Sequence, residues 1–138
     1  MEPATRIPTE QRIVAAATSL SYEKGYHVAT MREVAAAAGI KAGSLYNHFP
    51  GKEELLFLVT SRRMRELLEG GREAVAGEAE PRGRLRALVK QHVVYHARQR
   101  YQAKVADEQL HALPSARRAE VVAIRDAYAD FVLAALEP

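Results

Sequence analysis

The residues best equipped for chemistry lie close together, between Thr30 and Lys52, in the segment TMREVAAAAGIKAGSLYNHFPGK. Its polar side chains offer an amide, hydroxyls, an imidazole and cations. The sequence has no signature of a nucleophile paired with a base, a phosphate-binding loop or paired carboxylates, so it indicates no enzyme. An asparagine amide can pair with the edge of an adenine, and the other groups can donate to phosphates. These residue types predict a DNA-binding surface.

The segment divides into residues that would position the protein on DNA and residues that would read the sequence. Donors to phosphate fix the register without distinguishing bases, and four residues have this character: Thr30, Tyr46, His48 and Lys52. Three residues can contact base edges in the major groove: Arg32, Ser44 and Asn47. The small Ala42 and Gly43 would let a helix N-terminus approach the groove closely, and Lys41 would reach a phosphate.

Several of these residues also have a role that needs no DNA. In this alternative, Thr30 is a helix cap and makes no DNA contact, Tyr46 belongs to the core, and His48 and Lys52 are ordinary surface residues. The DNA-binding interpretation therefore depends on their coincidence within 23 residues and on the local structure that the same segment predicts.

The elements that position these side chains are predicted to form a helix-turn-helix. Thr30 and Glu33 have the spacing of a capping box, which marks the start of a helix. Gly39 can adopt the left-handed conformation that a tight turn requires. A second short helix is expected over about 42–49, ended by Pro50 and Gly51. In a helix-turn-helix the second helix enters the major groove of DNA.

The rest of the chain has helical periodicity throughout, so the expected fold is all-α. Thr9 is expected to cap a first helix over 10–24, and a fourth helix begins near Lys52 and is interrupted at Gly70-Gly71. The clearest loop is 77–83. Helices are then expected over 84–100 and 102–112, followed by a last helix capped by Ser115.

This pattern predicts three parts along the chain. Residues 1–8 are expected to form a flexible tail. Residues 9–54 would form a three-helix DNA-binding head, and residues 55–138 a helical C-terminal body.

Composition limits the partners and the compartment. The 138 residues include no cysteine, which excludes disulfides and thiolate metal sites and suits the cytoplasm. The sequence has neither an apolar run of the roughly 18 residues that a membrane span needs nor an apolar signal core. The net charge is +3, yet residues 1–54 hold six basic and six acidic side chains. The DNA-binding prediction therefore depends on where individual charges lie.

The stretch from Ile13 to about Leu58 resembles the DNA-binding domain of the TetR/AcrR family of transcriptional regulators. The matching positions are Gly25-Tyr26, Thr30, Val34-Ala35, Ala38-Gly39-Ile40, Gly43-Ser44-Leu45-Tyr46, His48-Phe49 and Lys52-Glu53-Glu54-Leu55-Leu56. The resemblance implies a ligand-responsive repressor that binds a palindromic operator in double-stranded DNA as a homodimer. It also implies that a small-molecule effector, either apolar or an acyl-CoA, binds in a C-terminal ligand-binding domain over 55–138, moves the fourth helix and releases the DNA.

The resemblance assigns DNA contacts to seven positions: Thr30, Arg32, Ser44, Tyr46, Asn47, His48 and Lys52. Two positions depart from the family pattern. Family members often have a small polar residue where this chain has Lys41, so the side-chain cap of the recognition helix would be missing. Asn47 often has an aromatic counterpart, which predicts a different reading of the operator.

The C-terminal half resembles the ligand domain of acyl-CoA-responsive members of the same family. The segments that carry this resemblance are 92–96, 108–113, 117–118 and 125–128. It implies an acyl-CoA effector whose acyl chain lies between apolar helix faces, with ligand contacts from His92, His96, Arg125 and Tyr128. His92 and His96 are one helical turn apart but supply only half of a metal site. We therefore interpret them as pocket or core residues and expect no metal and no cofactor.

The length of the chain leaves two alternatives to a complete regulator. Family members are usually longer, and their final two helices build the dimer, whereas this chain ends about where that pair should begin. It can be a C-terminally truncated regulator fragment without independent regulation. It can also be a helical interaction module whose helix-turn-helix contacts protein rather than DNA.

Overall fold

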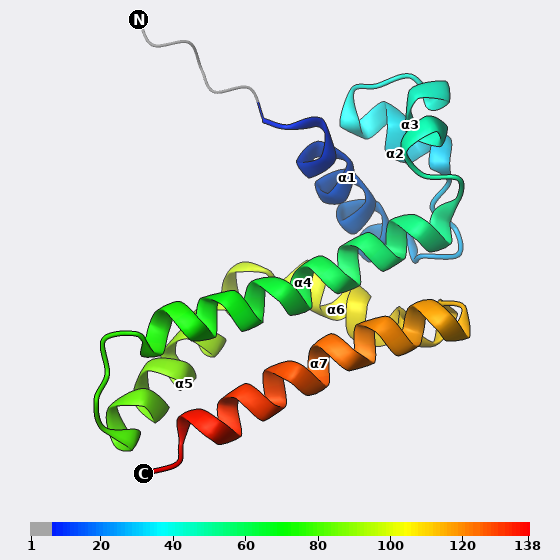
Figure 1. The fold of residues 1–138 in the computed structure, drawn as a ribbon. Coiled ribbons are helices and arrows are strands. Elements are labelled where there is room, and N and C mark those ends of the chain that lie inside the picture. Colours follow the sequence, from blue (N-terminus) through cyan, green and yellow to red (C-terminus); the bar gives the residue numbers. More distant parts are fainter. Residues whose placement is uncertain (1–6) are drawn as a thin grey trace, which may run out of the picture.

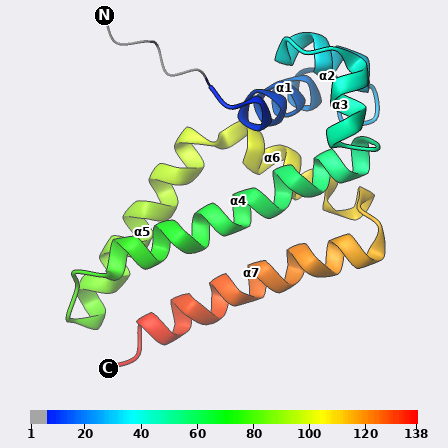
Figure 2. The same cartoon turned by 45° about the horizontal axis from the view of Figure 1, so that its top comes forward.

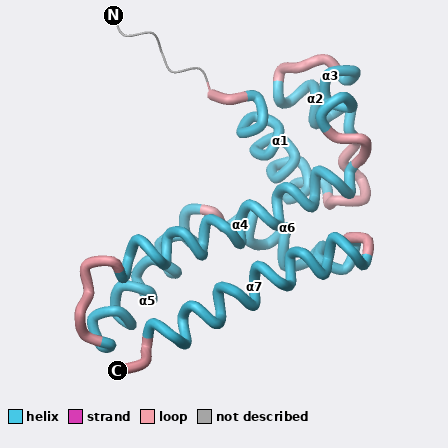
Figure 3. Tube along the Cα trace, viewed as in Figure 1, coloured by secondary structure: helices cyan, strands magenta, loops and turns pink. Residues whose placement is uncertain are grey.

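The computed structural model describes residues 7–138, so most of the predicted tail, residues 1–6, lies outside the described residues. Along the described residues the chain forms helices joined by loops, as Figure 3 shows, which confirms the predicted all-α fold. The elements in order are α1 (Thr9–Lys24), α2 (Met31–Ala38), α3 (Ala42–His48), α4 (Lys52–Val75), α5 (Pro81–Arg98), α6 (Arg100–Gln109), the 3-10 turn η1 (Leu110–Ala112) and α7 (Ser115–Ala135). None of these helices has the length and apolarity needed to cross a membrane.

Helices α1, α2 and α3 pack together at one end of the molecule (Figure 1), and we call this part the head. Its core is built from small and branched apolar side chains, among them Ile13, Val34 and Leu45. Leu55, from the first turn of α4, closes the same core. Burial of these side chains removes apolar surface from water and fixes the angle between the three short helices.

The remaining helices form the body, in which α4 lies between α5 and α7 (Figures 1 and 2). Helices α4 and α7 run in the same direction, and α5 runs opposite to them. Helix α6 packs against both α1 and α4 and so joins the head to the body. Leu56 belongs to the core of the body although its neighbour Leu55 belongs to that of the head. Helix α4 is thus shared by both cores.

The predicted interruption at Gly70-Gly71 is wrong, because α4 continues to Val75. A Cβ atom on Gly71 would lie 3.0 Å from Phe131 Cε1 and 3.4 Å from Leu88 Cδ2. The glycine therefore allows α5 and α7 to approach α4 closely. This close packing explains why a glycine stands inside α4, and the packing outweighs the low helix propensity of glycine.

Several predicted helix starts also differ from the structure. Thr9 and Ser115 are the first residues of α1 and α7 rather than caps, because Pro8 and Pro114 occupy the cap positions without a side-chain hydrogen bond. Helix α5 begins at Pro81 rather than at 84, so the predicted loop over 77–83 is shorter than expected. Proline is well suited to the first turn of a helix, where its missing N–H has no intrahelical partner.

Candidate nucleic-acid interface

The start of α2 is fixed by the predicted capping box between Thr30 and Glu33. The Glu33 backbone N–H donates to Thr30 Oγ1 at 3.2 Å, and the Thr30 N–H donates to Glu33 Oε2 at 2.9 Å. Lys24 Nζ, at the end of α1, also donates to Glu33 Oε1. The hydrogen bond from Lys24 and that from Thr30 lower the pKa of Glu33 to about 2. This network ties the two helices together and keeps the exposed Thr30 and Arg32 on the first turn of α2.

The turn between α2 and α3 follows the predicted geometry. Gly39 has φ +70°, in the left-handed region, and its N–H bonds to the carbonyl of Ala36 at 3.1 Å. Leu45 is completely buried and anchors α3 on the head core, with Ile40 and Phe49 packed partly buried beside it. Because α3 has only seven residues, one inward anchor determines which side chains point outward.

The outward residues of α3 include most of those that the sequence singled out for DNA. The residues exposed on α3 and at its N-terminal cap are Lys41, Gly43, Ser44, Tyr46, Asn47 and His48. Tyr46 is 49% exposed, so it does not belong to the core. Lys41 caps α3 without a side-chain hydrogen bond, as its departure from the small polar residue predicts. Ala42 was expected to face outward, but it is half-buried and packs on the head core.

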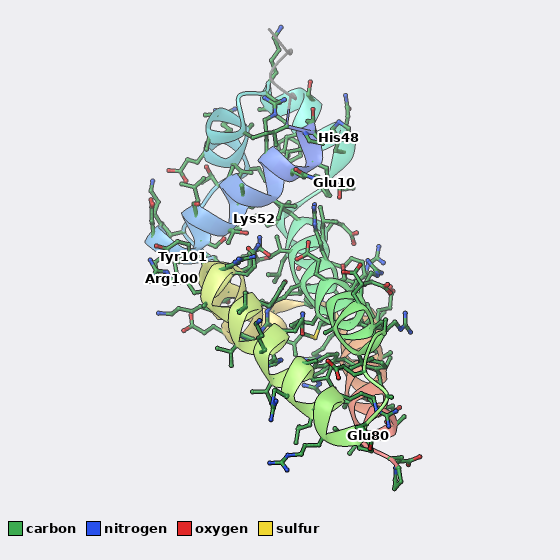
Figure 4. The ribbon with its side chains drawn as sticks, turned by 90° about the vertical axis from the view of Figure 1, so that its left-hand side faces the viewer. Glu10, His48, Lys52, Glu80, Arg100 and Tyr101 are labelled. Carbon is green, nitrogen blue, oxygen red and sulfur yellow. The ribbon has the colours of Figure 1, made fainter. Side chains whose placement is uncertain are left out.

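Lys52 is not an ordinary solvated surface charge. Its Nζ lies 4.7 Å from the centroid of the Tyr26 ring, and burial lowers the pKa of its ammonium. Lys52 is the first residue of α4, the helix that is shared by the cores of the head and the body. Figure 4 shows His48 in the head, Lys52 where the head meets the body, and Glu80 at the opposite end of the molecule.

Tyr26 is a residue of this site that the sequence analysis treated only as part of a motif. It is buried, and burial together with the charge of Glu53 raises the pKa of its hydroxyl. The signal was present in the pattern Gly25-Tyr26, where the glycine ends α1 at φ +92°. The pairing of Tyr26 with Lys52 spans a loop and two helices, so local sequence patterns could not predict it.

Three of the four predicted ligand residues come together in the body. His92 Nδ1 and Tyr128 Oη are 3.1 Å apart, and the His92 and His96 rings lie with centroids 4.3 Å apart. Arg125 does not join them: it is exposed, and its Nε lies 3.9 Å from Asp126 Oδ1. Across residues 7–138, three histidine or carboxylate side chains nowhere gather as a metal site would require.

The sequence analysis missed Arg63, the charged member of this cluster. The residue is only 5% exposed; Nη1 donates to Asp107 Oδ1 at 3.1 Å, and Nη2 lies 3.4 Å from His96 Nε2. Burial, with the positive charge of Arg63 close by, lowers the pKa of His96. Arg63 contacts His96 and is paired with Asp107, while His92 contacts both His96 and Tyr128. The connected cluster therefore offers several polar groups to a ligand.

Comparison with known families gives two matches that together cover most of the chain. Residues 13–59 match the sequence profile of the family described as "Bacterial regulatory proteins, tetR family". Residues 78–138 match that of "Tetracyclin repressor-like, C-terminal domain".

Individual relatives are regulators as well. The HTH-type transcriptional activator FasR of Mycolicibacterium smegmatis is 38% identical over 88 residues, covering 62% of this chain and 40% of the relative. The HTH-type transcriptional repressor KstR2 of Rhodococcus jostii is 40% identical over 73 residues, covering 53% of this chain and 36% of the relative. The similarity thus spans less than half the length of either of these curated relatives.

Solved structures extend the similarity over nearly the whole chain. A tetR-family regulatory protein from Rhodococcus RHA1 is similar with a TM-score of 0.79 and 30% identity, covering 88% of this chain and 64% of that one. AibR in complex with isovaleryl coenzyme A and operator DNA is similar with a TM-score of 0.76 and 29% identity, covering 93% of this chain and 70% of that one.

Proposed function

The chain belongs to the tetR family of bacterial regulatory proteins, and from that premise we propose that it binds a specific operator in double-stranded DNA and regulates transcription. This family consists of regulators rather than enzymes. We propose that residues 9–54 bind the DNA and that residues 55–138 bind an effector.

The exposed face of α3 is the observation that carries this proposal. The helix buries Leu45 and leaves Ser44, Tyr46, Asn47 and His48 exposed. Side chains of these types serve both base edges and phosphates in major-groove binding. Asn47 reads a base in this account, with Arg32 and Ser44 as further reading residues.

The positioning set donates to phosphates on either side of the groove. Its members are Thr30, Lys41, Tyr46, His48 and Lys52. The Thr30 hydroxyl also lies 3.2 Å from Glu33 Oε2 within the capping box, so it must turn to donate to a phosphate. Gly43, with open space where a Cβ would stand, lets the start of α3 approach the DNA.

We further propose that the protein acts as a homodimer on a palindromic operator and is released by an acyl-CoA effector. The similarity to AibR, whose structure holds isovaleryl coenzyme A and operator DNA, supports the effector class. The cluster of Arg63, His92, His96 and Tyr128 in the body supports a polar anchor for such a ligand. We propose from the family resemblance that the protein is a repressor; its similar relatives include both an activator and a repressor.

Selection from a random double-stranded DNA library tests the proposed function. The protein should enrich one sequence with two inverted half-sites whose centres are about 34–36 Å apart, one turn of DNA. The Asn47→Ala variant is selected in parallel. It leaves Leu45 and the head core unchanged and should lose preference at one position in each half-site. A helical protein-contact module would enrich no sequence, and that result would overturn the proposal.

Isovaleryl-CoA and longer acyl-CoA thioesters test the effector on the enriched operator. We expect at least one thioester to weaken operator binding by about tenfold or more, within the usual range of allosteric coupling. No effect from any chain length would refute the effector class while leaving DNA binding intact.

A further inference from the structure

The outward side of α5 carries an apolar row beside a basic row. The apolar row consists of Leu85, Val89 and Val93, which follow one another at one helical turn and are 46%, 54% and 60% exposed. The basic row lies three residues earlier in each turn and consists of the exposed Arg82, Arg86 and Lys90. Residues three or four positions apart are neighbours on a helix surface, so the two rows run side by side. Apolar side chains exposed together in this way mark an interaction surface.

The C-terminal half of α7 repeats this arrangement with the opposite charge. Its apolar row consists of the exposed Ala129 and Leu133, and Leu133 is 66% exposed. Its acidic row lies three residues earlier in each turn and consists of the exposed Asp126 and Asp130. Residues 126–138 hold three acidic side chains and no Lys, Arg or His, whereas α5 holds five Lys or Arg side chains and no Asp or Glu. The two helices thus have the same pattern and complementary charges.

Few of these charges are paired within one copy of the chain. Among the described residues 7–138, no carboxylate lies at ion-pair distance from any side chain of the basic row. In the same part of the chain Asp130 has no cation at this distance, and Asp126 has only its neighbour Arg125, whose Nε lies 3.9 Å from Asp126 Oδ1. Both charged rows are therefore available to a partner.

The rows of α5 and α7 lie on one face of the body. The two helices meet at His92 and Tyr128, where His92 Nδ1 lies 3.1 Å from Tyr128 Oη. Val93 follows His92 directly and Ala129 follows Tyr128 directly, so both apolar rows border this seam. Helix α4 packs at Gly71 against the inner side of α5 and α7, so the exposed rows form the outer side. We call this surface the α5–α7 face.

We propose that the α5–α7 face binds the same face of a second copy of the chain, with α5 of each subunit packed on α7 of its partner. Helix α5 runs opposite to α7 (Figure 1), so a two-fold axis parallel to these helices sets α5 of each copy antiparallel to α7 of the other. In this arrangement the apolar rows meet in the centre. The basic row of each α5 then lies beside the acidic row of the partner's α7, and such flanking charges fix partner and orientation.

The same symmetry places both DNA-binding heads correctly. A two-fold axis parallel to the body helices leaves α4 of both copies pointing in one direction, so both heads lie at the same end of the dimer. Both α3 helices can then reach one DNA duplex, as binding to two half-sites requires. The inference rests on the proposed homodimer and adds the surface that forms it. This surface lies on α5 and α7 and not on the final pair of helices that the family resemblance implies.

Charge reversal followed by sedimentation velocity on the full chain tests the α5–α7 face. We expect the original chain to be a dimer at about 100 µM, a concentration that fills an interface with a micromolar Kd. The double variants Arg86→Glu/Lys90→Glu and Asp126→Lys/Asp130→Lys should each dimerise at least about tenfold more weakly, because like charges then face each other. An equal mixture of the two variants should form dimers again, since every basic row in the mixed dimer faces an acidic row.

The matched control is Arg65→Glu/Arg72→Glu, which reverses two exposed cations on α4, outside the α5–α7 face. It should dimerise as tightly as the original chain. A mixture of the two charge-reversed variants that stays monomeric, or an equal loss in the control, would overturn the inference.

Leu133→Asp tests the same face without depending on the charged rows. Because Leu133 is exposed, the change leaves the core intact, and it should weaken dimerisation at least about tenfold by placing a charge between the apolar rows. Dimerisation of Leu133→Asp as tight as that of the original chain would show that the face is not the interface, even if a charge-reversed variant fails to fold.

The outcome for the face is separable from that for DNA binding. A chain that is monomeric at about 100 µM would overturn the inference, since a different protein would then have to cover the face. If that monomer still enriches a DNA sequence, the proposed DNA binding stands. A dimer that depends on the α5–α7 face but enriches no DNA sequence would refute the proposed function and leave the inference intact.

Discussion

Arg117 and Glu54 form a two-pronged ion pair that joins the first turn of α7 to the first turn of α4. Arg117 Nη2 lies 2.9 Å from Glu54 Oε2, and Nε lies 3.2 Å from Oε1. The Arg117 guanidinium also lies 4.3 Å from the centroid of the Phe57 ring. Glu54 is two residues from Lys52, so the pair holds the part of α4 that positions a proposed phosphate contact.

Breaking this pair should weaken operator binding several-fold through Lys52. We expect Arg117→Gln and Glu54→Gln to have similar effects on the operator Kd, and the double variant to be no worse than either single variant, because both remove the same interaction. The control is Arg72→Gln, which breaks the Arg72–Glu69 pair at the far end of α4. Additive losses in the double variant, or an equal loss in the control, would show that the pair has no such positioning role.

Replacing Asn47 and Lys52 should have different consequences for DNA binding. Asn47→Ala should reduce discrimination at one operator position by about 1–3 kcal/mol, the usual value of a two-pronged base contact. Lys52→Ala should weaken specific and random DNA alike, since a phosphate contact carries no sequence information. Fluorescence anisotropy with both DNAs measures this difference. Equal losses on operator and random DNA for Asn47→Ala would refute its reading role.

The capping box of α2 predicts a dependence of stability on pH. The pKa of Glu33 is lowered in the folded chain from its ordinary value of 4.5 to about 2. The stabilisation from ionised Glu33 is therefore complete above about pH 4.5 and is lost as the pH falls towards 2. Urea unfolding should show Glu33→Gln less stable than the original chain at pH 7, with the difference shrinking on acidification.

Thr30→Ala provides the companion measurement. Loss of the Thr30 cap should cost about 1 kcal/mol in the free energy of unfolding. Because the Thr30 hydroxyl does not titrate between pH 3 and pH 7, part of this loss in the free energy of unfolding should persist at pH 3. A Glu33→Gln deficit that grows on acidification would contradict the assigned direction of the pKa shift.

Gly71 should not tolerate a larger side chain. Gly71→Leu should lower the free energy of unfolding by about 1–3 kcal/mol, because the new side chain must displace Phe131 and Leu88. Gly77→Leu is the control, since a Cβ there would meet open space. Thermal or urea unfolding compares the two. Equal stability of both variants would show that α5 and α7 can move away from α4 without cost.

Local features of the sequence predicted the head well. The Thr30–Glu33 box, the left-handed Gly39 and the inward Leu45 each depend on residues a few positions apart, so their patterns are visible in the chain. The predicted caps at Thr9 and Ser115 are wrong for a local reason too. A proline precedes each residue and takes the cap position itself.

Contacts between distant helices could not be predicted in the same way. Gly71 reads as a helix breaker until the side chains of α5 and α7 are placed against it. Arg63 and Arg117 look like ordinary charges, and only their partners Asp107 and Glu54, at least 44 residues away in sequence, give them roles. The contact between the rings of Tyr22 and Tyr101 depends in the same way on how α6 packs against α1.

The salt dependence of operator binding tests the central proposal most directly. A dimer that uses Arg32, Lys41 and Lys52 from each subunit neutralises about six phosphates, so the logarithm of the binding constant should fall against the logarithm of salt concentration with a slope of roughly −5. Lys52→Ala should make this slope shallower by about two. Failure of the protein to retain DNA even at 50 mM salt would contradict the account.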